Sequence, residues 1–236
     1  MKLIFLFLFA FYSFISTSQN TNVVGLFPTI DHSGSLTNKL EYGIYYFGAF
    51  PFLNLTSQKI NNSEKFKLIY LEHSLTYNFT KDLYFTGSYL FQKENVLGSN
   101  YVNENRFYGQ LRYKQIFPLI TLSHRLRYDA RFIENRITNQ RPFTGRIRYL
   151  IGLEKSLSQN LYFSAYEELF FSTSKNVNPI YNENWAYTGI GKKISENNKI
   201  EMGILYVSWN LGYQSWLNQF YGQITWINHL NFCNDK

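Results

Sequence analysis

The stretch between Leu119 and Glu154 restricts the fold of this chain more than any other part of the sequence. Polar and apolar residues alternate through two runs in it. The first run places Thr121, Ser123, Arg125, Arg127, Asp129 and Arg131 on one face, and Leu122, His124, Leu126, Tyr128, Ala130 and Phe132 on the other. In the second run, Thr144, Arg146, Arg148 and Glu154 alternate with Phe143, Gly145, Ile147, Tyr149, Ile151 and Leu153. A period of two over this length predicts long β-strands with one polar and one apolar face.

Comparable runs recur along the chain and predict about ten strands. They cover residues 39–50, 66–77, 83–93, 105–116, 119–134, 143–155, 161–171, 184–194, 200–209 and 219–230. Each run is close to the ~9–11 residues with which a tilted strand crosses a bilayer. Residues 19–38 are polar apart from Val23–Phe27, so they predict an N-terminal segment or one extra short strand. That extra strand, or a split of residues 39–58, would raise the count to twelve.

The connections between these runs alternate between short and long. The short ones are residues 78–82, 117–118, 156–160 and 195–199, and the long ones are 51–65, 94–104, 135–142, 172–183 and 210–218. Short turns at one rim and longer loops at the other are typical of outer-membrane barrels, with the short turns in the periplasm. We therefore expect an all-β, antiparallel transmembrane barrel with extracellular long loops and both barrel ends at the periplasmic rim.

The N-terminus predicts export. Residues 1–18 combine Lys2, an apolar stretch and small residues before Gln19, which is the pattern of a secretory signal peptide. Residues 19–236 then form a single barrel domain, and an aromatic content of 19% suits the aromatic girdles of an outer-membrane barrel. We expect a monomer in the outer membrane of a Gram-negative bacterium. Its partners would be outer-membrane lipid, lipopolysaccharide and the barrel-assembly machinery, and not nucleic acid, because its basic residues lie on strand faces.

Charged residues gather on the polar face of the central strands and form a candidate lumen cluster. The cluster consists of Arg106, Arg125, Arg127, Asp129, Arg131, Arg146, Arg148 and Glu168. A two-residue turn at Phe117-Pro118 would place Arg106 opposite Asp129, and a turn around Ser158 would place Arg148 opposite Glu168. Facing opposite charges attract and fix strand register. The cluster either fills a narrow lumen with ion pairs or, because arginines exceed carboxylates, forms an anion-attracting pore or ligand site.

Catalysis is less well supported by the residues. A barrel lipid hydrolase needs a serine within hydrogen-bond reach of a histidine. Ser74 and Ser123 directly neighbour His73 and His124, so each serine points to the opposite face from its histidine, and no Ser–His pair is expected. His73 and His124 share the apolar face, where a bulge or a rim partner would have to accommodate them. No metal-ligand spacing or cofactor motif occurs, so we expect a structural, binding or transport role without cofactors. A lipid hydrolase and a soluble exported ligand-binding barrel, with its apolar face inward, are the alternatives.

Several segments resemble one known family. They are Leu122-Ser123-His124-Arg125-Leu126-Arg127-Tyr128 with Arg131-Phe132, Arg146-Ile147-Arg148-Tyr149, the run from Leu161 to Phe171, and Ala186-Tyr187-Thr188-Gly189-Ile190-Gly191. Together they resemble the exported Bacteroidota proteins of domain of unknown function 2490, over roughly residues 65–230. Asp129 and Lys192 depart from the family pattern, since the acidic residue is expected one position away and an aromatic residue after Gly191. The resemblance implies an outer-membrane-type barrel with no established activity.

Overall fold

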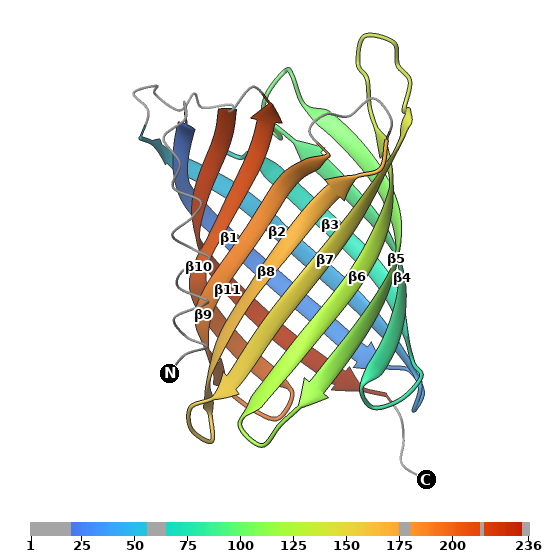
Figure 1. Cartoon of the computed structure of the whole chain (residues 1–236), viewed down its shortest axis with the longest axis vertical. Helices are drawn as coiled ribbons and strands as arrows, with labels where there is room; N and C mark the ends of the chain where they lie inside the picture. The colour runs from blue at the N-terminus through green and yellow to red at the C-terminus, as the bar shows by residue number, and fades with distance from the viewer. Residues whose placement is uncertain (1–19, 56–64, 175–179, 213–214, 233–236) are drawn as a thin grey trace.

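The computed structural model describes residues 20–55, 65–174, 180–212 and 215–232, and they form one closed β-barrel (Figure 1). Its eleven strands are β1 (Asn20–Ser35), β2 (Leu40–Asn54), β3 (Leu68–Asn78), β4 (Leu83–Glu94), β5 (Val102–Ile116), β6 (Ile120–Ile133), β7 (Phe143–Ser156), β8 (Leu161–Ser172), β9 (Tyr181–Lys193), β10 (Asn198–Gly212) and β11 (Ser215–Asn231). Sequential strands pair antiparallel, and β1 closes the barrel against β11. The predicted signal peptide, residues 1–18, lies outside the described residues. None of the described residues forms a helix that is long and apolar enough to cross a membrane.

The ten predicted strands are confirmed as β2 to β11, and the possible extra N-terminal strand is present as β1, which brings the count to eleven rather than twelve. Residues 20–35 form a full strand, which pairs parallel to β11 from Asn20 opposite Trp216 to Ser35 opposite Asn231. Gly25, Pro28 and Gly34 interrupt the polar–apolar alternation of this segment. Glycine and proline are also depleted in strand interiors, so the sequence signal for a full strand is weak here. The parallel pairing gives an odd strand number, which a run of antiparallel hairpins alone cannot close.

The two rims carry connections of different length, as predicted. One rim, which we call the short-turn rim, holds the connections at residues 36–39, 79–82, 117–119, 157–160 and 194–197. At the opposite, long-loop rim β2, β4, β6, β8 and β10 end, and the sequence between them and the next strands covers residues 55–67, 95–101, 134–142, 173–180 and 213–214. The long loop expected at 210–218 is wrong, because β10 continues to Gly212, whose φ of 83° suits glycine and permits a tight reversal. The expectation that both barrel ends share a rim is also wrong, since β1 begins at the long-loop rim and β11 ends at the other (Figure 1).

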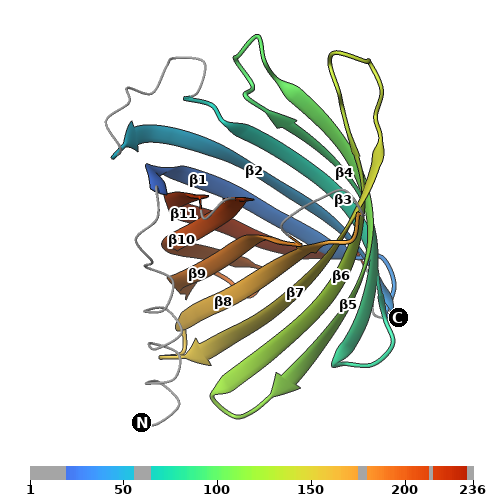
Figure 2. The same cartoon turned by 45° about the horizontal axis from the view of Figure 1, so that its top comes forward.

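The predicted alternation of faces is confirmed, with the polar face inward. On β6, Leu126 is 57% exposed on the outer surface, whereas its neighbour Arg127 is 5% exposed inside the barrel. The outer surface of the other strands carries further exposed apolar side chains, among them Leu71, Phe107 and Ile204. The barrel is therefore apolar outside, and β6 turns its polar face inward. Figure 2 shows the same barrel turned so that its top rim comes forward.

The two predicted hairpin registers are wrong by two residues each. Ile116 faces Thr121 rather than Leu119, because the N–H of Phe117 donates to the carbonyl of Ile120 across a longer turn. Two-residue hairpin turns need positive φ values or glycine, which a Phe-Pro sequence does not supply. Similarly, Ser156 faces Tyr162, since the hydroxyl of Ser158 accepts the N–H of Leu161 and lengthens that turn. An error of two residues keeps every side chain on its predicted face.

The interior has two chemically different walls. Aromatic rings from β1, β2 and β3 stack in a row, with centroid distances of 4.4 Å for Phe27–Phe47 and 4.3 Å for Phe47–Tyr70. Trp185 of β9 meets Phe27 edge-on at 6.0 Å and extends this apolar wall around the barrel. The facing wall, made by β5 to β8, carries the arginines. The aromatic wall supplies a packed core, and the charged wall forms the candidate site.

Candidate functional site

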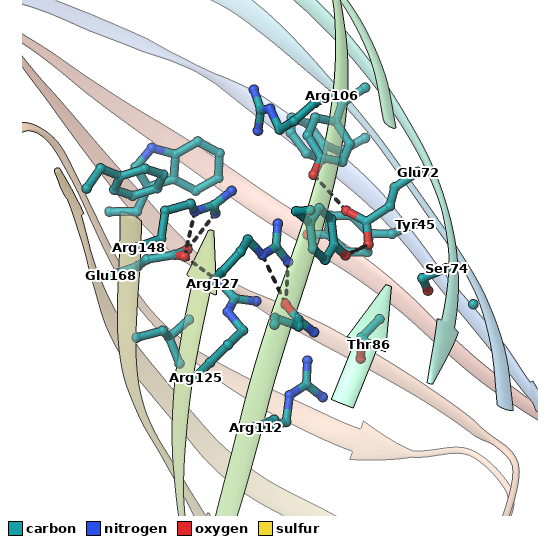
Figure 3. Close-up of a pocket in the computed structure, with 18 of the residues that line it drawn as sticks. Tyr45, Glu72, Ser74, Thr86, Arg106, Arg112, Arg125, Arg127, Arg148 and Glu168 are labelled. Atoms are coloured by element: carbon teal, nitrogen blue, oxygen red, sulfur yellow. Dashed lines mark hydrogen bonds and ion pairs between the residues drawn. The ribbon is translucent and has the colours of Figure 1, made fainter. Parts of the chain in front are cut away.

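A cavity of about 750 Å³ lies inside the barrel (Figure 3). Its lining reaches both rims: Ser33 and Glu41 lie near the short-turn rim, and Glu94 and Leu211 lie at the strand ends of the long-loop rim. Seven arginines line it, namely Arg106, Arg112, Arg125, Arg127, Arg131, Arg146 and Arg148. All seven belong to β5, β6 and β7. They share the inner face because inward positions recur at every second residue of a strand.

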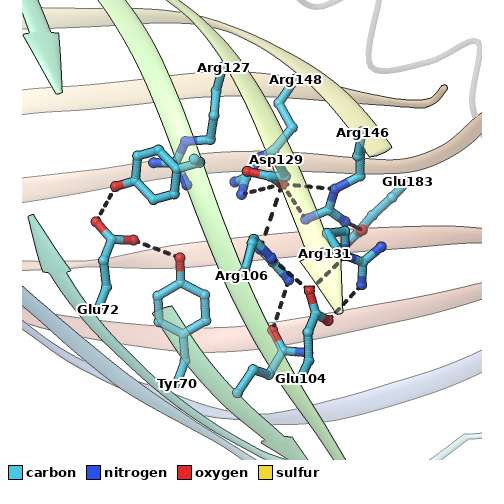
Figure 4. Close-up of polar contacts among 12 residues, drawn as sticks. Tyr70, Glu72, Glu104, Arg106, Arg127, Asp129, Arg131, Arg146, Arg148 and Glu183 are labelled. Carbon is cyan, nitrogen blue, oxygen red and sulfur yellow. Dashed lines mark hydrogen bonds and ion pairs between the residues drawn. The ribbon is translucent and has the colours of Figure 1, made fainter. Parts of the chain in front are cut away.

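Glu104 binds two of these arginines in the half of the lumen toward the long-loop rim (Figure 4). Its Oε1 accepts from Arg106 Nε at 2.8 Å and from Arg131 Nε at 2.7 Å, and its Oε2 accepts from Arg131 Nη2 at 2.8 Å. Arg106 and Arg131 face each other directly across β5 and β6. Facing like charges destabilise a sheet, so Glu104 offsets this repulsion.

Asp129 is the central carboxylate of the network and is 0% exposed. It faces Arg146 directly, and its Oδ2 accepts from Arg146 Nε at 3.1 Å and Nη2 at 2.9 Å. Nη1 of both Arg106 and Arg148 lies 3.7 Å from the same oxygen. Arg146 also donates from Nη1 to Glu183 of β9 at 2.9 Å. A single buried carboxylate therefore connects β5, β6 and β7.

The predicted ion pairs are present although the predicted registers are not. Arg148 donates to Glu168 through Nε at 2.7 Å and through Nη2 at 2.8 Å, which is a bidentate contact. Arg106 and Asp129 approach to 3.7 Å. Both pairs are diagonal rather than directly opposite, since Tyr108 faces Asp129 and Leu150 faces Glu168. Arginine side chains are long enough to reach such diagonal neighbours.

Two lumen arginines make no contact within ion-pair distance of any described carboxylate. Arg127 instead donates through Nε and Nη2 to Oε1 of Gln110, at 3.0 and 2.8 Å, and lies 3.7 Å above the ring of Tyr108. Arg112 makes no hydrogen bond or ion pair with the described residues. The nearby carboxylate of Glu72 is occupied, because Tyr70 donates to its Oε2 at 2.7 Å and Tyr108 donates to its Oε1. The cluster thus contains seven arginines and four carboxylates in contact with them.

All eight residues of the predicted lumen cluster lie together inside the barrel, with Asp129 buried behind the cavity lining. Sequence reasoning missed Arg112, Glu72, Glu104 and Glu183 as members. Arg112 shares its strand face with Arg106, which was a usable signal. Glu104 falls in a predicted loop because the predicted strand starts at residue 105, three residues after the start of β5. Glu183 is missed in the same way, because the next such strand is predicted from residue 184 and β9 starts at Tyr181.

The histidines lie away from this cluster. His73 is exposed on the outer surface, and His124 Nδ1 lies 2.9 Å from the hydroxyl of Tyr149 on the outer face of β7, the partner that its position required. The expectation that no serine contacts a histidine is wrong, because the parallel pairing of β1 with β11 was not foreseen. His229 Nδ1 lies 2.9 Å from Ser33 Oγ, and Nε2 lies 3.1 Å from Ser35 Oγ. Within the described part of the chain, no three His, Cys, Asp or Glu side chains are grouped to hold a metal ion.

The comparisons agree with the resemblance seen in the sequence. The family model described as "Protein of unknown function (DUF2490)" matches residues 52–218. The chain belongs to this DUF2490 family. The matched region contains β3 to β10 and therefore the whole arginine-bearing wall of the lumen, whereas β1 lies outside it. No curated protein matches the chain.

Proposed function

We propose that this DUF2490 protein is an outer-membrane β-barrel that takes small anionic solutes into its lumen. The observation that carries the proposal is a cavity of about 750 Å³ whose wall reaches both rims and carries seven arginines. Only four carboxylates contact those arginines. Asp31, Glu41, Glu72 and Glu94 line the cavity from β1 to β4, so the positive charge is local to the arginine-bearing wall of β5 to β7. That wall attracts anions, and the confined space strengthens this attraction relative to bulk water.

The distribution of polarity supports insertion in a membrane. A soluble ligand-binding barrel turns its apolar face inward, whereas this barrel exposes Leu71, Phe107, Leu126 and Ile204 on its outer surface. Closed barrels satisfy all backbone hydrogen bonds between strands, which lets them enter lipid. The signal-peptide pattern of residues 1–18 supports export to the outer membrane. We propose outer-membrane lipid and lipopolysaccharide as its surroundings, the barrel-assembly machinery as its partner during insertion, and a monomeric state.

Conductance in planar bilayers tests this function. Purified protein is reconstituted under a potassium chloride gradient, and the reversal potential is measured. We expect a conductance with chloride preferred over potassium, and a smaller preference in an Arg127→Gln variant, which loses a lumen charge that no carboxylate offsets. The matched control is Arg141→Gln, which removes the same charge from the long-loop rim. A bilayer without conductance, or with cation preference, contradicts the proposal.

Lipid hydrolysis is the second candidate, since Ser33 Oγ lies 2.9 Å from His229 Nδ1. Catalysis by such a pair needs a third group that orients the histidine. Here serine hydroxyls contact both ring nitrogens, and the contacts join β1 to β11 across the parallel seam. We therefore propose that His229 fastens the seam and that the protein is not an enzyme. Turnover of phospholipid or lipopolysaccharide in micelles that is lost in a His229→Ala variant would contradict this assignment.

A further inference from the structure

Three pairs of arginines face each other directly on β5, β6 and β7, and carboxylates contact them in different ways. Glu104 bridges Arg106 and Arg131. The pair of Arg127 with Arg148 has Glu168 and Asp129 at Arg148. In the third pair, Glu168 contacts Arg125 at 2.6 Å, whereas Arg112 forms no ion pair with a described carboxylate, so no carboxylate bridges the two arginines. Facing like charges repel, and in the first pair Glu104 offsets this repulsion. The pair of Arg112 and Arg125 has no such bridging anion.

Donors remain available at this position. Arg125 gives Nη2 to Glu168 at 2.6 Å, but its buried Nε has no hydrogen-bond partner. Arg127 lies diagonally opposite Arg112 and two residues along β6 from Arg125, and it uses only Nε and Nη2 for Gln110. Buried donors without partners cost free energy, which a bound acceptor would recover. Figure 3 shows Arg112, Arg125 and Arg127 along the same wall of the cavity, with Arg125 reaching toward Glu168.

The surroundings suit an oxyanion. Hydroxyl groups of Ser74, Thr86 and Ser123 line the same cavity and add O–H donors or acceptors. Asp31 and Glu41 also line it, from β1 and β2, and neither lies within ion-pair distance of a described arginine. The forked guanidinium group matches phosphate and carboxylate oxygens in bidentate geometry. Three such groups exceed what one carboxylate can engage, so a tetrahedral dianion fits the site better.

We propose that Arg112, Arg125 and Arg127 form a binding site for the phosphate group of a small solute. The anion occupies the position between β5 and β6 that corresponds to Glu104 between Arg106 and Arg131. A cavity of about 750 Å³ leaves room for a small organic body attached to the phosphate. The site rests on the proposed function only in that solutes must enter the lumen.

Calorimetric titration of the purified full-length protein in detergent micelles tests the site, with inorganic phosphate as the probe and acetate as the comparison anion. We expect phosphate to bind more tightly than acetate. Arg112→Gln should weaken phosphate binding by about tenfold or more, the loss typical of a charge-assisted hydrogen bond. The matched control Arg131→Gln removes the same lumen charge, but from a guanidinium that Glu104 already occupies, and should weaken binding less than about threefold. Arg112→Lys keeps the charge and loses the fork, so its phosphate affinity should lie between those of wild type and Arg112→Gln. If the glutamine variant does not fold, weaker phosphate binding by Arg112→Lys than by wild type is the test.

Three results would overturn the site: wild-type protein that does not bind phosphate, equal loss in the Arg112→Gln and Arg131→Gln variants, or acetate binding as tight as phosphate binding. Failure of the site is distinguishable from failure of the proposed function. Anion-selective conductance without phosphate binding overturns the site alone, whereas phosphate binding without conductance overturns passage alone.

Discussion

Replacing Asp129 with asparagine keeps the shape of the side chain and removes the charge at the centre of the arginine network. Its Oδ2 lies 2.9 Å from Nη2 of Arg146 and 3.7 Å from Nη1 of both Arg106 and Arg148. The residue is 0% exposed, so water cannot replace the lost charge. Three buried guanidinium groups would then lose their shared counter-ion.

The expected loss follows from this burial. Removing one partner of a buried ion pair costs about 3–5 kcal/mol, because it leaves an uncompensated charge in a low-dielectric site. Each of the three arginines keeps a second carboxylate: Glu104 for Arg106, Glu168 for Arg148 and Glu183 for Arg146. We therefore expect the lower end, about 3 kcal/mol, which is a change of roughly a hundredfold in the folded-to-unfolded ratio.

Chemical unfolding in detergent micelles, followed by tryptophan fluorescence, measures this change, since Trp185 packs inside the barrel. The matched control is Glu134→Gln. Glu134 lies 4.0 Å from Arg141, and the side chain of Arg141 is 41% exposed. Exposed pairs of this kind contribute about 0–1 kcal/mol. An Asp129→Asn variant that loses no more stability than this control would refute the view that the network holds β5, β6 and β7 together.

Three further predictions concern other parts of the barrel. Leu126→Arg, in the middle of β6 on the outer face, should lower the free energy of unfolding in liposomes by about 2–4 kcal/mol; no change would argue against contact with lipid. Tyr108→Phe keeps the ring under Arg127 but removes one donor to Glu72, so unfolding in micelles should become easier by about 1–3 kcal/mol; unchanged stability would mean that this hydrogen bond contributes nothing. His229→Ala should speed amide hydrogen exchange at the end of β1 near the short-turn rim and leave β6 unchanged; equal protection in both proteins would show that the histidine does not hold the seam.

The sequence predicts most of the fold because a period of two is preserved through each strand. The faces of β5 to β8 follow directly from alternation, and so does the gathering of Arg106, Asp129, Arg146 and Arg148 inside the barrel. The predicted ion pairs are present although the predicted registers are wrong, because a register shift of two residues leaves each side chain on the same face of the sheet. A long arginine side chain then reaches its diagonal carboxylate.

What the sequence does not predict is set by turn geometry and by contacts distant in the chain. The registers depend on the turns at Pro118 and Ser158, whose hydrogen bonds lengthen each hairpin. β1 has weak alternation of its own and is held by parallel pairing with β11, about two hundred residues away in the chain. The contact of Ser33 with His229 follows from that seam and has no local signal.

Labelling along β6 tests the central claim most directly, namely that the outer face of the barrel contacts lipid while the arginine-bearing face contacts water. Single cysteines replace Leu126, Tyr128, Ser123 or Arg125 in a Cys233→Ser background, and a fluorophore on each is exposed to brominated lipid in liposomes. The account predicts quenching at Leu126 and Tyr128 and none at Ser123 and Arg125. Absence of quenching at all four positions, or quenching at Ser123 and Arg125 instead, would contradict it.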